Sequence, residues 1–349
     1  MISLCECLDK LRSPDERERM FAAEDIGYLN LPEGVPSLTS RLFEESSVAV
    51  RDAIFQALVR MDGAAPVEGA IGLLFSEDTQ IRNQAVDVLR HKGQQAIPSL
   101  SRAMREGGRD VRKLVLDVLS GTSLPGSGEI YSLALSDEDP NVVITAVESL
   151  GGIRALEYRD RIEALLESGG HPMLIAACME ALAGLGQACS IEAIRRTFPR
   201  LELVPDFLLA SYLKAIGSFG EETDFHAIAG LLDVRTAHLR PAIFAALQSI
   251  HARWQLPGPG EELLPTLRAV IENGDPPLCR YQAVQLLGCW AVIPGIFDYL
   301  AQCLESSERL VRLAAAESLI RVPGAGKEAL IAARQLNEID EEILQALGC

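Results

Sequence analysis

A pattern that returns about every 31 residues is the feature that most restricts how this chain of 349 residues folds. Each copy has an apolar residue, an arginine, two variable residues, an apolar residue, a variable residue, an acid or amide, an apolar residue and leucine. The clearest copies are residues 50–58, 81–89 and 111–119. Weaker copies are residues 19–26, 142–150, 174–182, 208–216, 239–247, 279–287 and 311–319. Apolar residues at i, i+4, i+7 and i+8 form one stripe of an α-helix, so every copy predicts a helix.

A second amphipathic stretch precedes each copy, and several of these stretches carry a proline close to their start, as at Pro36 and Pro98. Proline is tolerated in the first turn of a helix because its missing N–H would be unpaired there anyway. Short polar turns such as residues 76–78 supply N-caps for the following helix. The hydrophobic residues, 48% of the chain, are mostly aliphatic, since aromatic residues are only 5%. The sequence therefore predicts an all-α protein built from two-helix units.

These paired helices, with turns such as Asp139-Pro140 and alanine-rich second helices, resemble HEAT repeats. The resemblance is closest to the short repeats of phycobilisome-lyase-like proteins, and it covers nearly the whole chain with about ten repeats. It implies a single α-solenoid over residues 1–349, in which antiparallel helix pairs stack into a HEAT-like superhelix. First helices would line its convex side and second helices its concave side.

The charge balance excludes several classes of partner. Asp and Glu number 49 against 32 Lys and Arg, which gives a net charge of −17. This field repels phosphate backbones and anionic lipid surfaces, so we expect neither nucleic acid nor membrane insertion. It also argues against the DNA-glycosylase members of the HEAT group. The N-terminus lacks a basic segment and reaches Glu6 at once, so we expect no secretion signal and a cytoplasmic protein.

No pattern in the chain predicts catalysis or a cofactor. The eight cysteines include no CxxC pair, and no two of the five histidines have the i, i+4 spacing of a helix-borne metal site. Cys178 and Cys279 occupy positions of small buried apolar residues. Glycine-rich phosphate loops and nucleophile elbows are absent from the sequence. We therefore expect no metal, no cofactor and no enzymatic activity.

The residue five positions after each arginine defines a second series along the chain. Its members are Glu24, Gln56, Asp87, Asp117, Glu148, Glu180, Lys214, Ala245, Gln285 and Glu317. In one interpretation the arginines and acids, such as Arg82 and Asp87, pair in a ladder between repeats. In the other, the acids form a stripe on the concave face that captures a basic partner. The arginine is replaced by Val143, Ile175 and Leu209 in the middle repeats, so the freest acids are expected at Glu148 and Glu180.

The spacing of the repeats is irregular in one region. Arg240 and Arg280 are 40 residues apart, and residues 254–262 include two Pro-Gly pairs, which predicts an inserted turn near a binding site. Four polar or aromatic residues beside it are candidate interface residues: Trp254, Tyr281, Gln282 and Gln285. Trp290 falls at a core position. Residues 324–349 are expected to form a C-terminal cap, with an acidic amphipathic helix at 339–347 that is either a cap or a dimer contact.

These features predict a non-enzymatic scaffold or adaptor that holds a basic protein partner on an acidic concave face. The candidate partner-binding residues are Glu148, Glu180, Asp87, Asp117, Lys214, Tyr281, Gln282, Gln285 and Trp254. The resemblance to phycobilisome-lyase-like repeats implies an alternative, a tetrapyrrole-handling lyase or chaperone in which Tyr281 and Trp254 stack on the flat ligand.

Overall fold

The computed structural model describes residues 3–233, 237–272 and 275–335, and this part of the chain is helical with no strand. The first helices of the pairs, with the last helix, are α1 Leu4–Lys10, α3 Val35–Leu42, α5 Ala64–Leu73, α7 Ile97–Glu106, α9 Ser127–Ala134, α11 Arg159–Ser168, α13 Ile191–Thr197, α15 Glu222–Ala229, α17 Gly260–Glu272, α19 Pro294–Cys303 and α21 Ala325–Gln335. The second helices are α2 Glu16–Tyr28, α4 Val48–Arg60, α6 Thr79–Lys92, α8 Arg109–Leu119, α10 Pro140–Gly152, α12 Pro172–Leu185, α14 Leu209–Phe219, α16 Arg240–Trp254, α18 Pro277–Gly288 and α20 Arg309–Leu319. Short 3₁₀ helices are Pro32–Gly34, Gly93–Ala96, Leu156–Tyr158, Ala188–Ser190, Leu201–Leu203, Asp206–Leu208, Gly230–Asp233 and Ala237–Leu239.

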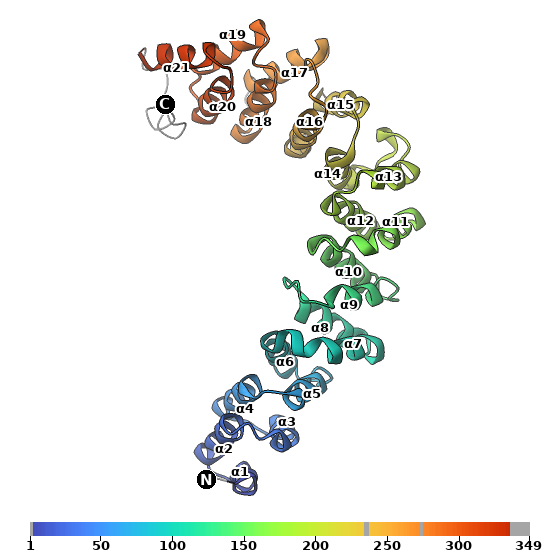
Figure 1. Ribbon diagram of the computed structural model, residues 1–349, viewed down its shortest axis with the longest axis vertical. Coiled ribbons are helices and arrows are strands. Elements are labelled where there is room, and N and C mark those ends of the chain that lie inside the picture. Colours follow the sequence, from blue (N-terminus) through green and yellow to red (C-terminus); the bar gives the residue numbers. More distant parts are fainter. Residues whose placement is uncertain (1–2, 234–236, 273–274, 336–349) are drawn as a thin grey trace. The chain divides into compact units, whose positions relative to one another are not determined.

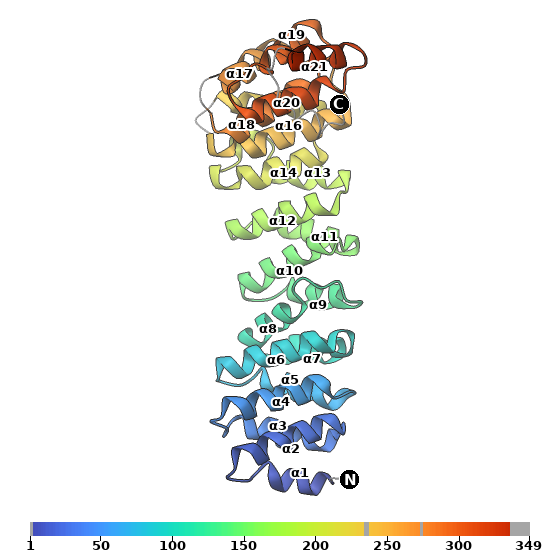
Figure 2. The same ribbon diagram turned by 90° about the vertical axis from the view of Figure 1, so that its left-hand side faces the viewer.

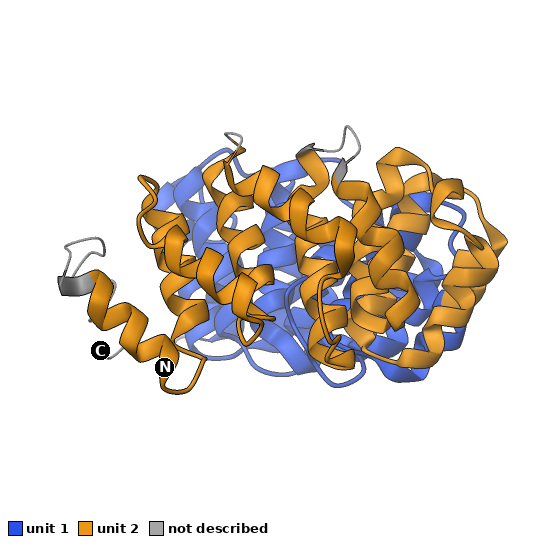
Figure 3. Cartoon of the chain, turned by 90° about the horizontal axis from the view of Figure 1, so that it is seen from above, with its two compact units in different colours: residues 1–162 blue, residues 163–349 orange. Residues whose placement is uncertain are grey.

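Each copy of the sequence pattern lies in or overlaps an even-numbered helix, which confirms the predicted α-solenoid of helix pairs (Figure 1). The chain packs as two compact units, residues 1–162 and 163–349, coloured separately in Figure 3. In unit 1 the second helices α2 to α10 form one layer, which faces the viewer in Figure 2, and the first helices form the other.

The core of unit 1 lies between these two layers. Val50, Ile54 and Leu58, which are the i, i+4 and i+8 residues of one copy, are fully buried. Tyr131 of α9 is also buried, and its hydroxyl donates to the carbonyl oxygen of Leu119 at 2.9 Å. A buried tyrosine hydroxyl needs such a partner. Burial of the apolar stripe therefore stabilises both layers, as the pattern predicts.

An aromatic cluster forms part of the core of unit 2. Trp290 is buried, as predicted, and its Nε1–H donates to the carbonyl oxygen of Leu256 at 2.8 Å. Its ring centre lies 6.0 Å from that of Phe225 and 4.8 Å from that of His251, in edge-to-face geometry. Burial lowers the pKa of His251. Cys178 and Cys279 are buried as predicted too.

Polar turns cap α6 and α10 as the sequence predicts, whereas Glu308 at the start of α20 makes no side-chain cap hydrogen bond. Asp78 is the N-cap of α6, where its carboxylate accepts from the N–H of Gln80 at 2.8 Å. Asp139 caps α10 in the same way, accepting from the N–H of Asn141 at 2.8 Å. The caps satisfy backbone donors that have no partner within the helix.

The 40-residue step between Arg240 and Arg280 contains the predicted turn, because residues 255–259, which include Pro257 and Gly258, are non-helical. α16 ends at Trp254, Gln255 adopts a positive φ of 49°, and α17 begins at Gly260. The helices on both sides of this turn are longer as well: α16 has 15 residues and α17 has 13, against 13 in α4 and 10 in α5. Buried apolar residues on α17, such as Leu263 and Leu267, explain why this segment is helical.

Only part of the expected C-terminal cap can be described. α21 contributes a buried Leu330 to the end of unit 2. The acidic helix expected at 339–347 lies outside the described residues. A hydrophobic helix of membrane-spanning length does not occur in the part of the chain that the structure describes.

Candidate functional site

The exposed side of the second helices, called here the second-helix face, carries the acid series in unit 1. The members of this series are exposed and come one from each second helix: Glu24, Gln56, Asp87, Asp117 and Glu148. The apolar stripe turns toward the first helices, so the position five residues after the arginine turns outward. The structure thus places Asp87, Asp117 and Glu148 at exposed positions of the second helices.

The arginines of the pattern bind backbone oxygens of the preceding turn. Arg82 Nη1 donates to the carbonyl oxygens of Ser76 at 2.7 Å and Glu77 at 2.9 Å. In unit 2, Arg312 makes the same contact with the carbonyl oxygen of Ser306 at 2.7 Å. The arginine side chain therefore pins the inter-helix turn to the second helix of the same repeat.

Several of these arginines also bind an acid in the turn of the next repeat. In unit 1, Arg19 Nε lies 2.8 Å from Glu45 Oε2, and Arg112 Nε lies 2.5 Å from Asp137 Oδ2. The corresponding pairs elsewhere are Arg51 with Asp78, Arg240 with Asp275 and Arg280 with Glu308. The arginines form a ladder between repeats, although its acids come from the turns.

The expected pairing of arginines with the acid series, as of Arg82 with Asp87, is therefore wrong. Five residues correspond to about 140° around a helix, so the two side chains leave in different directions. Asp87 instead lies 3.5 Å from Arg90 on the exposed surface. Arg90 also donates to the backbone oxygen of Asp117 at 2.7 Å, which joins α6 to α8.

Two of the predicted acids have unengaged carboxylates. Neither Asp117 nor Glu148 has a side-chain hydrogen bond or ion pair within the described ranges 3–233, 237–272 and 275–335. Both are exposed. They are thus available to a cation from outside the chain.

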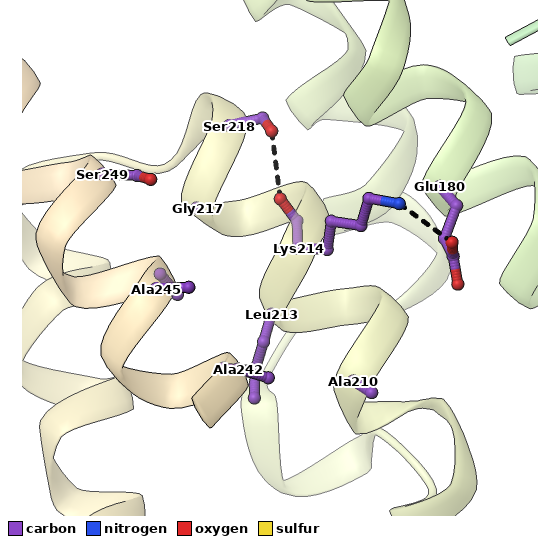
Figure 4. Close-up of a pocket in the computed structure, with 10 residues that line it drawn as sticks. Glu180, Ala210, Leu213, Lys214, Gly217, Ser218, Ala242, Ala245 and Ser249 are labelled. Carbon is purple, nitrogen blue, oxygen red and sulfur yellow. Dashed lines mark hydrogen bonds and ion pairs between the residues drawn. The ribbon is translucent and has the colours of Figure 1, made fainter. Parts of the chain in front are cut away.

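Glu180, in unit 2, is not a free acid. Its Oε1 accepts from Ser211 Oγ at 2.9 Å. Its Oε2 accepts from Lys214 Nζ at 3.0 Å, as Figure 4 shows. Burial raises the pKa of Glu180, but hydrogen bonds from Lys214 and Ser211 outweigh it and hold this pKa below its ordinary value. The expectation of an unpartnered acid here is wrong because Lys214 on the next second helix neutralises it.

A groove of about 410 Å³ lies beside this ion pair, between α14 and α16. Small side chains form much of its wall, as Figure 4 shows for Ala210, Ala242 and Ala245. The part of the second-helix face around this groove is accordingly poor in free charge.

A larger groove of about 650 Å³ lies between α2 and α4 of unit 1. Its wall includes Glu24, Asp25, Tyr28, Asp52 and Arg60. Tyr28 is 74% exposed, and the guanidinium of Arg60 lies 6.0 Å from the centre of its ring. The sequence analysis missed Tyr28 because this residue follows the weakest copy of the pattern. Since aromatic residues are only 5% of the chain, a tyrosine beyond the apolar stripe could have been chosen as a candidate binding residue.

Tyr281, Gln282 and Gln285 are the candidate interface residues on α18. Tyr281 and Gln285 contact α20, and Gln282 is half-buried. Tyr281 hydroxyl donates to Glu317 Oε2 at 2.8 Å, and Gln285 Nε2 donates to the same oxygen. Burial, followed by the nearby Glu317, raises the pKa of Tyr281. Gln282 is half-buried, and its Oε1 has no hydrogen-bond partner in the described part of the chain. Tyr281 and Gln285 therefore lie together, as predicted for a shared site, but both side chains donate to Glu317 of α20.

Trp254 faces a different neighbour. Its Nε1–H donates to the carbonyl oxygen of Gly220, at the end of α14, at 3.0 Å, and the side of its ring is exposed. Tyr281 turns toward α20 instead. Trp254 and Tyr281 are thus held by different neighbours, Gly220 and Glu317, and these contacts give no support to the tetrapyrrole alternative.

No metal site is evident in the described ranges: no group of three or more His, Cys, Asp and Glu side chains there is placed to hold an ion.

Comparison with known proteins supports the fold. No protein-family model matches the sequence, and no curated protein matches it. A crystal structure of importin beta superimposes with a TM-score of 0.56 at 11% identity, covering 96% of this chain and 54% of that one. The fold is a HEAT-like α-solenoid. This chain spans about half the length of that importin beta chain, and the phycobilisome-lyase-like subtype and the count of ten repeats stay predictions. An Escherichia coli protein, YibA, matches with 14% identity over 61% of this chain and 80% of that one, but its TM-score of 0.34 carries no argument.

Proposed function

We propose that this protein is a non-enzymatic scaffold or adaptor that holds a Lys- and Arg-rich protein partner on its second-helix face. The observation that carries the proposal is the exposed acid series of unit 1, in which Asp117 and Glu148 have no partner among the described residues. Solenoids present such extended surfaces because every repeat contributes one stretch of exposed helix. The solenoid fold shared with importin beta is compatible with this role.

Binding of this kind depends on many weak contacts. Exposed charges contribute little each, and salt screens them, so association should be fast and should weaken as ionic strength rises. Within unit 2, Lys214 neutralises the exposed carboxylate of Glu180. We therefore assign the main contact to the acids of unit 1.

The experiment compares two variants with the same change in net charge. The first replaces Asp52, Asp87, Asp117 and Glu148 with lysine on the second-helix face. The control replaces four exposed acids of the first-helix side in the same unit, Glu33, Glu106, Glu129 and Glu157. A fluorescein-labelled Lys/Arg-rich peptide is the probe, and anisotropy gives its Kd at several salt concentrations.

We expect the face variant to weaken binding at least about tenfold, or about 1.4 kcal/mol, and the control to weaken it by no more than about threefold. Equal losses in both variants would show that net charge alone attracts the peptide, and would contradict the proposal.

A further inference from the structure

Two exposed phenylalanines lie on the turns of neighbouring repeats in unit 1. Phe43 follows α3 and Phe75 follows α5, so they are 32 residues apart, close to one repeat. They are 59% and 55% exposed, in a chain with few aromatic residues. Exposed aromatic side chains that line a shared hollow mark interaction sites more often than scattered ones do.

Both phenylalanines line one groove of about 520 Å³, called here the turn groove. The buried Ile81 contributes to its wall, and so does Gly72 of α5. A Cβ added to Gly72 would have no atom within 4 Å, so the space beside this glycine is open. The turn groove therefore has an apolar part, lined by Phe43, Phe75 and Ile81, and open space beside Gly72 that can receive a side chain from outside.

The charge at the rim of the turn groove is negative. Arg51 lines it, but its guanidinium donates to the carbonyl oxygen of Glu45 at 2.9 Å and lies 3.3 Å from Asp78 Oδ2. Glu77 is exposed, and its carboxylate has no partner within the described ranges. Because Arg51 is paired with Asp78, the unpaired carboxylate of Glu77 favours a cationic partner at this rim. A second copy of this chain, with its net charge of −17, would be repelled.

We propose that the turn groove binds a partner segment in which one large apolar side chain is flanked by Lys or Arg. The apolar side chain lies between Phe43 and Phe75, beside Gly72, and the flanking cations lie near Glu77. This inference rests on the proposed function for the basic character of the partner, but it concerns a surface at the inter-helix turns that the acid series does not include.

The test begins with a random twelve-residue peptide library displayed on phage and selected against the whole protein. The expected enriched class has one Leu, Ile, Met or Phe with at least two Lys or Arg within three residues of it. Enriched peptides are then synthesised, and their Kd values are measured by fluorescence anisotropy.

Three variants show where the enriched peptides bind. The double variant Phe43→Ser/Phe75→Ser removes the aromatic walls, and Gly72→Gln fills the open space without burying a polar group. Phe207→Ser removes a phenylalanine of unit 2 that is 66% exposed and is the matched control. Thermal unfolding followed by circular dichroism checks that all three remain folded; Gly72→Gln should not lower the unfolding temperature, because glycine is unfavourable within a helix.

We expect the double variant and Gly72→Gln each to weaken binding at least tenfold, and Phe207→Ser to leave it within twofold. The inference would be overturned if no peptide class is enriched or if the enriched class lacks the apolar residue. It would also be overturned if the peptides have the same Kd for all three variants. Peptides that lose affinity only for the four-lysine variant of the second-helix face would uphold the proposed function and overturn this inference. Peptides that lose affinity only for the turn-groove variants would uphold this inference and overturn the proposed function.

Discussion

Gly27 of α2 lies directly against Ala57 of α4: a Cβ at Gly27 would lie 2.7 Å from both the Cα and the Cβ of Ala57. Gly288 of α18 lies against Ser318 of α20 in the same way, with only 2.5 Å to the Cβ of Ser318. Both glycines lie in the last turn or two of a second helix. The absence of a side chain thus permits two second helices to approach each other closely.

Replacing Gly27 with alanine should lower the free energy of unfolding by about 1–3 kcal/mol, because the methyl group meets the backbone of α4 and the helices have to separate. Gly72→Ala is the control, since the space beside Gly72 is open, and it should raise stability by about 0.5–1 kcal/mol. Urea denaturation midpoints measure both. If the two substitutions shift the midpoint in the same direction, the close approach of α2 and α4 is not as described.

The bidentate pair of Arg19 and Glu45 should be the most consequential ion pair in unit 1. The Glu45 side chain is fully buried, and its oxygens lie 2.8 and 2.9 Å from Nε and Nη2 of Arg19. Arg19→Met leaves a buried carboxylate short of a partner and should cost about 3 kcal/mol. Arg17→Met, at an exposed site on the same helix, should change stability by less than about 0.5 kcal/mol. Hydrogen exchange of α2 and α4 amides reports the effect locally, and equal protection in the two variants would refute it.

The same pair predicts how stability depends on pH. Burial raises the pKa of Glu45, but hydrogen bonds from Arg19, from the N–H of Ser47 and from Arg41 lower it to about 2, from an ordinary value of 4.5. A lowered folded-state pKa stabilises the fold above the unfolded-state pKa, and this contribution is lost as pH falls from about 4.5 toward 2. The contribution is on the order of 3 kcal/mol. Urea midpoints of the wild type and Glu45→Gln should therefore differ most at pH 6–7 and converge near pH 2.5; a gap that does not change with pH would contradict this.

The ion pair of Glu180 and Lys214 should behave differently. Both side chains are about half exposed, so solvent screens their attraction. The double variant Glu180→Gln/Lys214→Met should change the free energy of unfolding by less than about 1 kcal/mol. Thermal unfolding of the single and double variants gives the coupling between the two residues. A coupling above about 2 kcal/mol would mean that the pair is more deeply buried than the structure shows.

The sequence predicted the second helices well, because the apolar residues of each copy are what the fold buries. Val50, Ile54 and Leu58 show this, since their spacing alone identifies the inward side of α4. Around the 40-residue step, Pro257 and Gly258 correctly indicated the turn between α16 and α17, but the sequence pattern did not reveal that these two helices are longer than α4 and α5.

Prediction of the candidate site was less complete. The outward positions of Asp117 and Glu148 follow from the helical period, but the pairing of Glu180 does not, because Lys214 comes from the next repeat 34 residues away. That lysine stands in the same series, so its charge was a usable signal. The acids that pair with the arginines lie in the turn of the next repeat. The spacing of residues within one helix does not predict the conformation of that turn.

The ladder of arginines makes neighbouring repeats of a unit depend on each other. Arg112 holds its own turn through the carbonyl oxygen of Gly107 and the next turn through Asp137. If one repeat opened alone, its neighbour would keep a guanidinium or a carboxylate without its counterion. Melting of unit 1 is therefore expected to be a concerted transition across the bridged repeats, with fraying confined to the ends of the array.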